Sequence, residues 1–78
     1  MDKHFITHDL NLTATIVALG HTLENIQKNA DGRAAFCFKR TEQLKQDVTA
    51  YWQQGITIQG HKLFDSLKYV KSRLYHAG

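Results

Sequence analysis

An Asp-Gly dipeptide near the middle of the chain, Asp31-Gly32, is the feature that most constrains the fold. Asp-Gly is among the strongest β-hairpin signals, because both residues tolerate the positive φ that such turns require. Strands are therefore expected on both sides, over His21 to Lys28 and over Arg33 to Arg40. In the return strand Phe36 and Phe38 share one face, an alternation typical of a half-buried strand. The sequence predicts a β-hairpin.

The register of this hairpin depends on its first strand, whose apolar residues do not alternate. Leu23 and Ile26 differ in parity, so both face inward only if the strand contains a bulge. A two-residue loop would place both phenylalanines opposite polar residues. A longer loop that closes Lys28 on Arg33 places Leu23 opposite Phe38 instead. The longer loop is favoured, and the register stays open at this stage.

A helix is predicted before the hairpin, from about Asp9 to Leu19, after a short extended lead-in from His4 to Thr7. Asp9 is a suitable N-cap, because its side chain can accept from the free amides of the first turn. Gly20 is placed as the C-terminal stop. The apolar positions recur at helical spacing, at Leu12, Ile16 and Leu19, and Ala14, Val17 and Ala18 widen the stripe.

A second helix is predicted after the hairpin, from Thr41 or Glu42 to about Gln54. Thr41 can cap it, and Gly55 ends it. Its expected buried stripe consists of Leu44, Val48 and Tyr51 with Trp52.

The segment Ile56-Thr57-Ile58 is short and β-branched, so it is expected to be extended, either as a third edge strand or as a strap over the core. The last helix runs from Gly60 or His61 to Tyr75. Its apolar residues follow i, i+4, i+7, i+11 spacing, at Leu63, Leu67, Val70 and Leu74, with Phe64 and Tyr75 on the flank.

The order helix, hairpin, helix, helix predicts an α+β fold with the helices packed on one face of a two- or three-stranded antiparallel sheet. The length of 78 residues indicates a single small domain, residues 1–78. A chain this short buries only about 60% of the surface that its unfolded form exposes, so its core is marginal. Dimerisation is one remedy.

The compartment is predicted from what the sequence lacks. The N-terminal residues have no basic segment followed by an apolar stretch, as a signal peptide would. The longest apolar run, Ala34 to Phe38, is far shorter than the ~20 residues that span a bilayer. A single cysteine fits a reducing compartment. We expect a soluble, cytoplasmic protein with no membrane partner.

Catalytic and metal chemistry are not favoured by the residue spacing. Five histidines are present. His4 and His8 are four residues apart, but the stretch between them is expected to be extended. A His61–Asp65 pair is possible at i, i+4 spacing, but two ligands do not make a structural zinc site. Cys37 lies between two phenylalanines, where apolar surroundings disfavour the thiolate. Neither a Gly-x-Ser-x-Gly elbow nor a phosphate-binding glycine loop occurs. We expect no enzyme activity, no cofactor, no metal and no small-molecule substrate.

The positive charge is concentrated near the C-terminus. The net charge is +3, and residues 1–53 contribute none of it, because their six basic and six acidic side chains cancel. The excess comes from Lys62, Lys68, Lys71 and Arg73, which are opposed only by Asp65. Lys39 with Arg40 could extend the same strip. Such a face can contact nucleic acid weakly and in a salt-sensitive way, but it more often serves only as a solvated surface.

Protein contacts are the favoured function. A small sheet has strand edges that natural proteins cover by pairing or by charge. The outer face of the return strand is small and apolar at Ala35 and Cys37, which suits close approach by a second copy. Tyr69 on the last helix is a further candidate contact. The sequence therefore predicts a non-enzymatic binding module that acts on a protein partner or on itself, with nucleic-acid binding as the alternative.

The chain also resembles a family of short bacterial and phage- or plasmid-borne proteins whose domain has no known function. The matching segments are Phe5-Ile6-Thr7-His8-Asp9-Leu10, Ala18-Leu19-Gly20-His21, Phe36-x-Phe38 with Thr41-Glu42-Gln43-Leu44, Ala50-Tyr51-Trp52, Phe64-Asp65-Ser66-Leu67 and Lys71-Ser72-Arg73-Leu74-Tyr75. They cover nearly the whole chain. The resemblance implies a stand-alone small domain, often encoded on mobile elements. It assigns no functional residue, because the matching positions are mostly those expected in the core or at caps.

Overall fold

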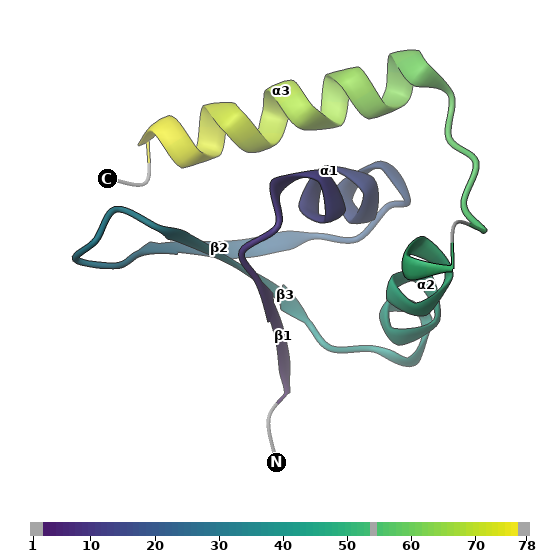
Figure 1. Ribbon diagram of the computed structural model, residues 1–78, viewed down its shortest axis with the longest axis horizontal. Coiled ribbons are helices and arrows are strands. Elements are labelled where there is room, and N and C mark those ends of the chain that lie inside the picture. The colour runs from purple at the N-terminus through teal and green to yellow at the C-terminus, as the bar shows by residue number, and fades with distance from the viewer. Residues whose placement is uncertain (1–2, 54, 77–78) are drawn as a thin grey trace.

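The computed structural model describes residues 3–53 and 55–76, which form three strands and three helices (Figure 1). In chain order these are β1 His4–Thr7, α1 Leu10–Ala18, β2 Leu23–Lys28, β3 Ala34–Lys39, α2 Glu42–Trp52 and α3 Gly60–His76. The strands make one antiparallel sheet in the order β1-β3-β2. The predicted α+β class is confirmed.

The third strand of the sheet is the N-terminal segment, β1, which pairs with β3. The sequence indicated only that this segment is extended. The alternative third strand, Ile56-Thr57-Ile58, is wrong as a strand, because it pairs with no other segment that the structure describes. Ile56 and Ile58 are instead half-buried beside Tyr51, while Thr57 is exposed. This placement matches a strap over the core.

The hairpin contains the bulge that the parity of its apolar residues requires. Leu23 lies opposite Phe38 and Ile26 opposite Phe36, and the register shifts between Leu23 and Asn25. The favoured pairing of Leu23 with Phe38 is confirmed. At the turn the closure differs by one residue, because Lys28 lies opposite Ala34 rather than Arg33. Beyond the bulge, the shifted register continues to the hairpin loop.

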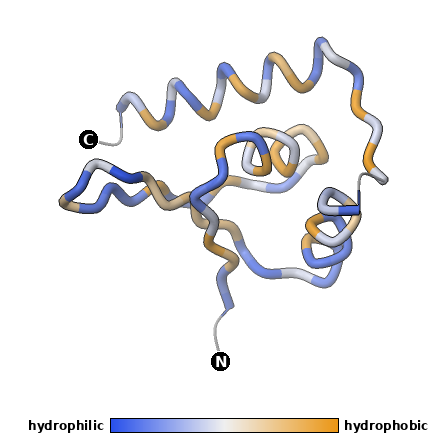
Figure 2. Tube along the Cα trace, in the orientation of Figure 1, coloured by the Kyte–Doolittle hydropathy of each residue, from blue (hydrophilic) through white to orange (hydrophobic). Residues whose placement is uncertain are grey.

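The hydrophobic core lies between the inner face of the sheet and all three helices. Its buried members are Leu12, Ile16, Leu23, Ile26, Phe36, Phe38, Leu44 and Val70, which come from α1, α2, α3 and both hairpin strands. In Figure 2, α1 is mostly hydrophobic, whereas hydrophobic and hydrophilic residues alternate along α3. This pattern fits a central helix buried on nearly every side and an outer helix with one apolar stripe.

The helix α1 buries two threonines without leaving their hydroxyls unpaired. Thr13 donates to the carbonyl of Asp9 at 2.8 Å, and Thr15 donates to that of Asn11 at 2.9 Å. Such bonds to the preceding turn allow a polar side chain to occupy a buried helical position. Asp9 caps the helix by accepting from the Leu12 amide at 3.0 Å, as predicted. Gly20 follows the helix with φ +102°, as the C-terminal stop requires.

The helix α2 corrects one predicted core residue. Thr41 caps it as expected, accepting from the Leu44 amide at 3.0 Å. Trp52 was placed in the buried stripe but is 62% exposed. It directly follows Tyr51 and is therefore turned about 100° away from the face that packs inward. The helix ends at Trp52, and the predicted terminus at Gln54 lies outside the described residues.

Among the described residues, no helix combines the length and the apolar character needed to cross a membrane.

Candidate interaction surfaces

The free edge of β1 is one candidate surface. The Arg40 amide donates to the Lys3 carbonyl at 2.8 Å, in the same register that pairs Phe5 with Phe38 and Thr7 with Phe36. Hydrogen-bonded and non-hydrogen-bonded pairs alternate along an antiparallel ladder. Ile6 therefore directs its N–H and C=O away from β3, and no other described strand pairs with β1 on that side.

The outer face of the sheet adjoins this edge. The core residues of the strands and of all three helices lie on the inner face, so the helices leave the outer face uncovered. Ile6 is 53% exposed there, opposite Cys37 on β3. Ala35 shares this face, on the central strand, and is 9% exposed. The structure thus brings Ala35 and Cys37 together and adds a larger apolar neighbour, Ile6, that sequence reasoning did not select.

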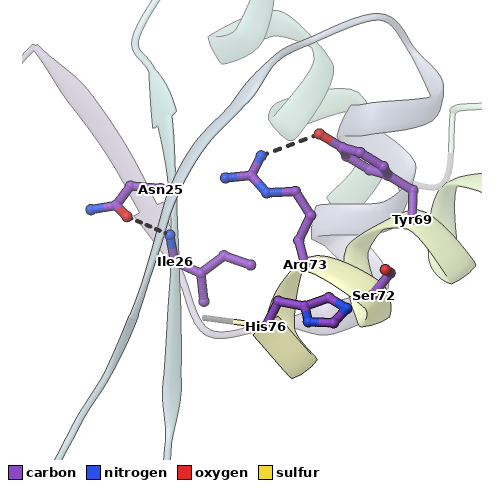
Figure 3. A pocket seen from close by; sticks show the side chains of 6 residues that line it. All are labelled: Asn25, Ile26, Tyr69, Ser72, Arg73 and His76. Carbon is purple, nitrogen blue, oxygen red and sulfur yellow. Dashed lines mark hydrogen bonds between the residues drawn. The ribbon is translucent and has the colours of Figure 1, made fainter. Parts of the chain in front are cut away.

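The free edge of β2 is covered by a side chain from α3 (Figure 3). The guanidinium of Arg73 donates from Nη1 to the backbone carbonyl of Leu23. The same nitrogen lies 3.2 Å from the Tyr69 hydroxyl, and the guanidinium carbon lies 5.9 Å from the Tyr69 ring centre. Arg73 is half-buried. It is therefore part of the fold at the bulged end of β2.

A second polar group of this edge is paired within β2 itself. The Ile26 amide donates to Oδ1 of Asn25 at 2.9 Å. Figure 3 shows the two side chains on opposite sides of the strand, with Ile26 directed towards α3. The Asn25 side chain therefore lies on the outer face of the sheet and accepts a hydrogen bond from a backbone amide at the β2 edge.

A cavity of about 480 Å³ lies between this edge and α3, lined by Asn25, Ile26, Tyr69, Ser72, Arg73 and His76. Among the described residues that line it there is no carboxylate and no thiol. Tyr69, 47% exposed, belongs to this cavity. It is therefore separated from Ala35 and Cys37, which lie on the other side of the sheet.

The basic residues predicted to contact nucleic acid do not form one strip. Lys62, Lys68 and Lys71 are exposed on α3. Lys39 ends β3 and Arg40 follows it, and this end of β3, where the chain passes to α2, lies on the opposite side of the molecule from α3 (Figure 1). Because Arg73 is bonded to the Leu23 carbonyl and half-buried, the exposed Lys and Arg side chains of α3 are the three lysines.

The histidines make separate local contacts. His61 and Asp65 form the pair expected from their spacing, at 3.1 Å. His21 Nε2 lies 2.6 Å from Asp47 Oδ2 and joins the segment after α1 to α2. His8 Nδ1 lies 2.9 Å from the Ala34 carbonyl.

The pairs made by His21 and His8 each span 26 positions, so no local sequence pattern could have revealed them. Among the described residues, no three His, Cys, Asp or Glu side chains are grouped so that they could hold a metal ion.

The comparisons with known proteins give a family and no activity. A family model described as Domain of unknown function (DUF5659) matches residues 2–76, and the chain therefore belongs to this family. No curated protein and no solved structure matches the chain. The bacterial, phage or plasmid origin inferred from the resemblance stays a prediction.

Proposed function

We propose that this chain is a non-enzymatic binding module that acts through protein–protein contacts, and that one of these contacts is with a second copy of itself. The observation that carries the proposal is the position of Ile6. Its backbone polar groups point away from the sheet at the β1 edge, and its side chain is 53% exposed on the helix-free face. An exposed edge of this kind is a template for pairing with another strand.

Antiparallel pairing of two β1 strands about a two-fold axis near Ile6 would satisfy these groups in both copies. Such an interface is self-complementary, since each copy contributes the same residues. The two Ile6 side chains would then meet on the outer face, close to Cys37 of each copy. Because β1 has only four residues, the contact area is small. We expect a weak, concentration-dependent dimer.

Light scattering after size-exclusion chromatography, over a wide range of protein concentration, tests the proposal. The mass should rise from 8.9 kDa towards twice that value as concentration increases. Ile6→Lys should stay monomeric, because two ammonium groups would face each other at the two-fold axis. Gln27→Lys is the matched control, because it adds the same charge on the outer side of β2, away from β1. A wild-type mass that stays at 8.9 kDa throughout would contradict self-association.

Nucleic-acid binding is the second candidate, supported by the three exposed lysines of α3. Their contacts would be to phosphates, so binding should be weak and should decrease steeply with salt. Titration of labelled single- and double-stranded DNA at low and moderate salt tests this alternative. Binding that disappears in the triple variant Lys62→Gln, Lys68→Gln, Lys71→Gln would favour it over the first proposal. No binding at low salt would exclude it.

A further inference from the structure

A second concave surface lies on the helical side of the molecule, away from β1 and the outer face. It is a cleft of about 600 Å³ between the hairpin, the start of α1 and the last turns of α3. Its apolar lining includes Leu10 and Leu74, which are half-buried and packed against the hydrophobic core, and Phe36, a core residue that is 2% exposed. A cleft of this volume is within the range of ligand-binding sites, ~300–1,000 Å³.

Among the described residues, the Lys, Arg, Asp and Glu side chains that line this cleft have one sign of charge. Lys28 lines it from the hairpin and Lys71 lines it from α3, and both are exposed. No carboxylate is among the described residues that line the cleft. Tyr75, 86% exposed, adds an aromatic ring beside Lys71. The surface therefore combines an apolar floor with positive charges on two separate elements.

One wall of the cleft is held in place by a hydrogen bond. His8 Nδ1 lies 2.9 Å from the carbonyl of Ala34, and both residues line the cleft. The bond ties the segment before α1 to the first residue of β3. The apolar floor is thus formed by elements that are already joined, so a ligand would not have to order them.

We propose that this cleft binds a segment of a partner protein that carries apolar side chains flanked on both sides by carboxylates. The apolar side chains would cover Leu10 and Leu74, and the carboxylates would pair with Lys28 and Lys71. The two lysines come from different elements, which suits a ligand with acidic groups on either side of its apolar part. A fatty acid, with one terminal carboxylate, matches this arrangement less well.

The test is an NMR titration of the ¹⁵N-labelled full chain with three capped hexapeptides. The probe is Glu-Glu-Leu-Phe-Glu-Glu, and the controls are Lys-Lys-Leu-Phe-Lys-Lys and Glu-Glu-Ser-Ser-Glu-Glu. We expect saturable amide shifts at Lys28, Lys71 and Tyr75 with the probe alone. No shifts with the probe, or equal shifts with the serine control, would overturn the proposal.

Two charge-reversal variants locate the site. The double variant Lys28→Glu, Lys71→Glu should lower the affinity for the probe about tenfold, because two attractive ion pairs become two repulsive contacts. Lys45→Glu with Lys62→Glu makes the same change in net charge outside the cleft and should alter the affinity less than about twofold. Equal weakening by both pairs would indicate attraction to overall charge and contradict a site in the cleft. Tighter binding of dodecanoate than of the probe, with shifts at the same residues, would contradict a protein partner.

Discussion

The two edges of the sheet differ in how their backbone polar groups are satisfied. At the β2 edge, Arg73 donates to the carbonyl of Leu23, and Asn25 accepts from the amide of Ile26. At the β1 edge, Ile6 presents its N–H and C=O outward, and no described strand lies beside it. The fold therefore covers one edge with its own side chains, whereas at the other edge Ile6 faces no described strand.

One long side chain from α3 accounts for part of this difference. Arg73 lies fifty positions after Leu23 and reaches it because α3 packs across α1 towards β2. Its guanidinium, a fixed fork of donors, is well suited to bond a carbonyl and a hydroxyl together. β1 lies at the other edge of the sheet.

The largest effect is expected from removing the closure of β2. Arg73→Met keeps most of the apolar length of the side chain but leaves the Leu23 carbonyl without its donor. Hydrogen bonds to charged groups contribute ~1.5–3 kcal/mol, so the free energy of unfolding should fall by about 2 kcal/mol. Urea denaturation measures this change. Lys71→Met, on the exposed side of the same helix, is the control and should cost less than ~0.5 kcal/mol. Equal losses in the two variants would show that Arg73 does not close the edge.

A smaller effect is expected at Asn25. Asn25→Ala removes the acceptor for the Ile26 amide and should lower the free energy of unfolding by about 1 kcal/mol. Hydrogen exchange should also accelerate at Ile26. Asn25→Asp retains an acceptor oxygen and should keep the Ile26 amide protected. Unchanged exchange in Asn25→Ala would mean that this amide does not depend on the side chain.

At the β1 edge the monomer should tolerate substitution. Ile6→Thr retains a β-branched side chain at a position that is more than half exposed, so the free energy of unfolding at low concentration should change by less than ~0.5 kcal/mol. The same variant should reduce dimer formation at high concentration. A loss of 2 kcal/mol or more in dilute solution, on the order of a buried-residue truncation, would place Ile6 in the monomer core and remove the contrast between the edges.

The smallest effect is expected at alkaline pH, where ionisation of Tyr51 should lower the free energy of unfolding. Burial, and to a lesser extent the charge of Asp9, raise the pKa of Tyr51 above 10.0. The folded state favours the neutral phenol, so this contribution to stability is complete below pH 10.0 and is lost as pH rises through the folded-state pKa. Tyrosinate absorbance in wild type and Tyr51→Phe checks this.

Local sequence signals predicted the parts of the fold that depend on neighbouring residues. The caps at Asp9 and Thr41 are short-range bonds, and the bulge follows from the odd spacing of Leu23 and Ile26 against Phe36 and Phe38. Trp52 was misplaced because an apolar residue beside a helical stripe has no local marker of which side it faces. The role of Arg73 was missed because its partner is far away in sequence and is a backbone carbonyl. The pairing of β1 with β3 was not predicted for the same reason, because the two strands are far apart in sequence.

The most direct test of the central claim is hydrogen exchange along β1 at two protein concentrations. Phe5 and Thr7 direct their amides to β3 and should be protected at both concentrations, whereas Ile6 directs its amide outward. We predict rapid exchange of the Ile6 amide in dilute solution and clear protection at high concentration. In the Ile6→Lys variant, the amide at position 6 should exchange equally fast at both concentrations. Exchange at Ile6 that is equally fast at both concentrations, or equally slow, would contradict the claim that this edge is open in the monomer and closed by a second copy.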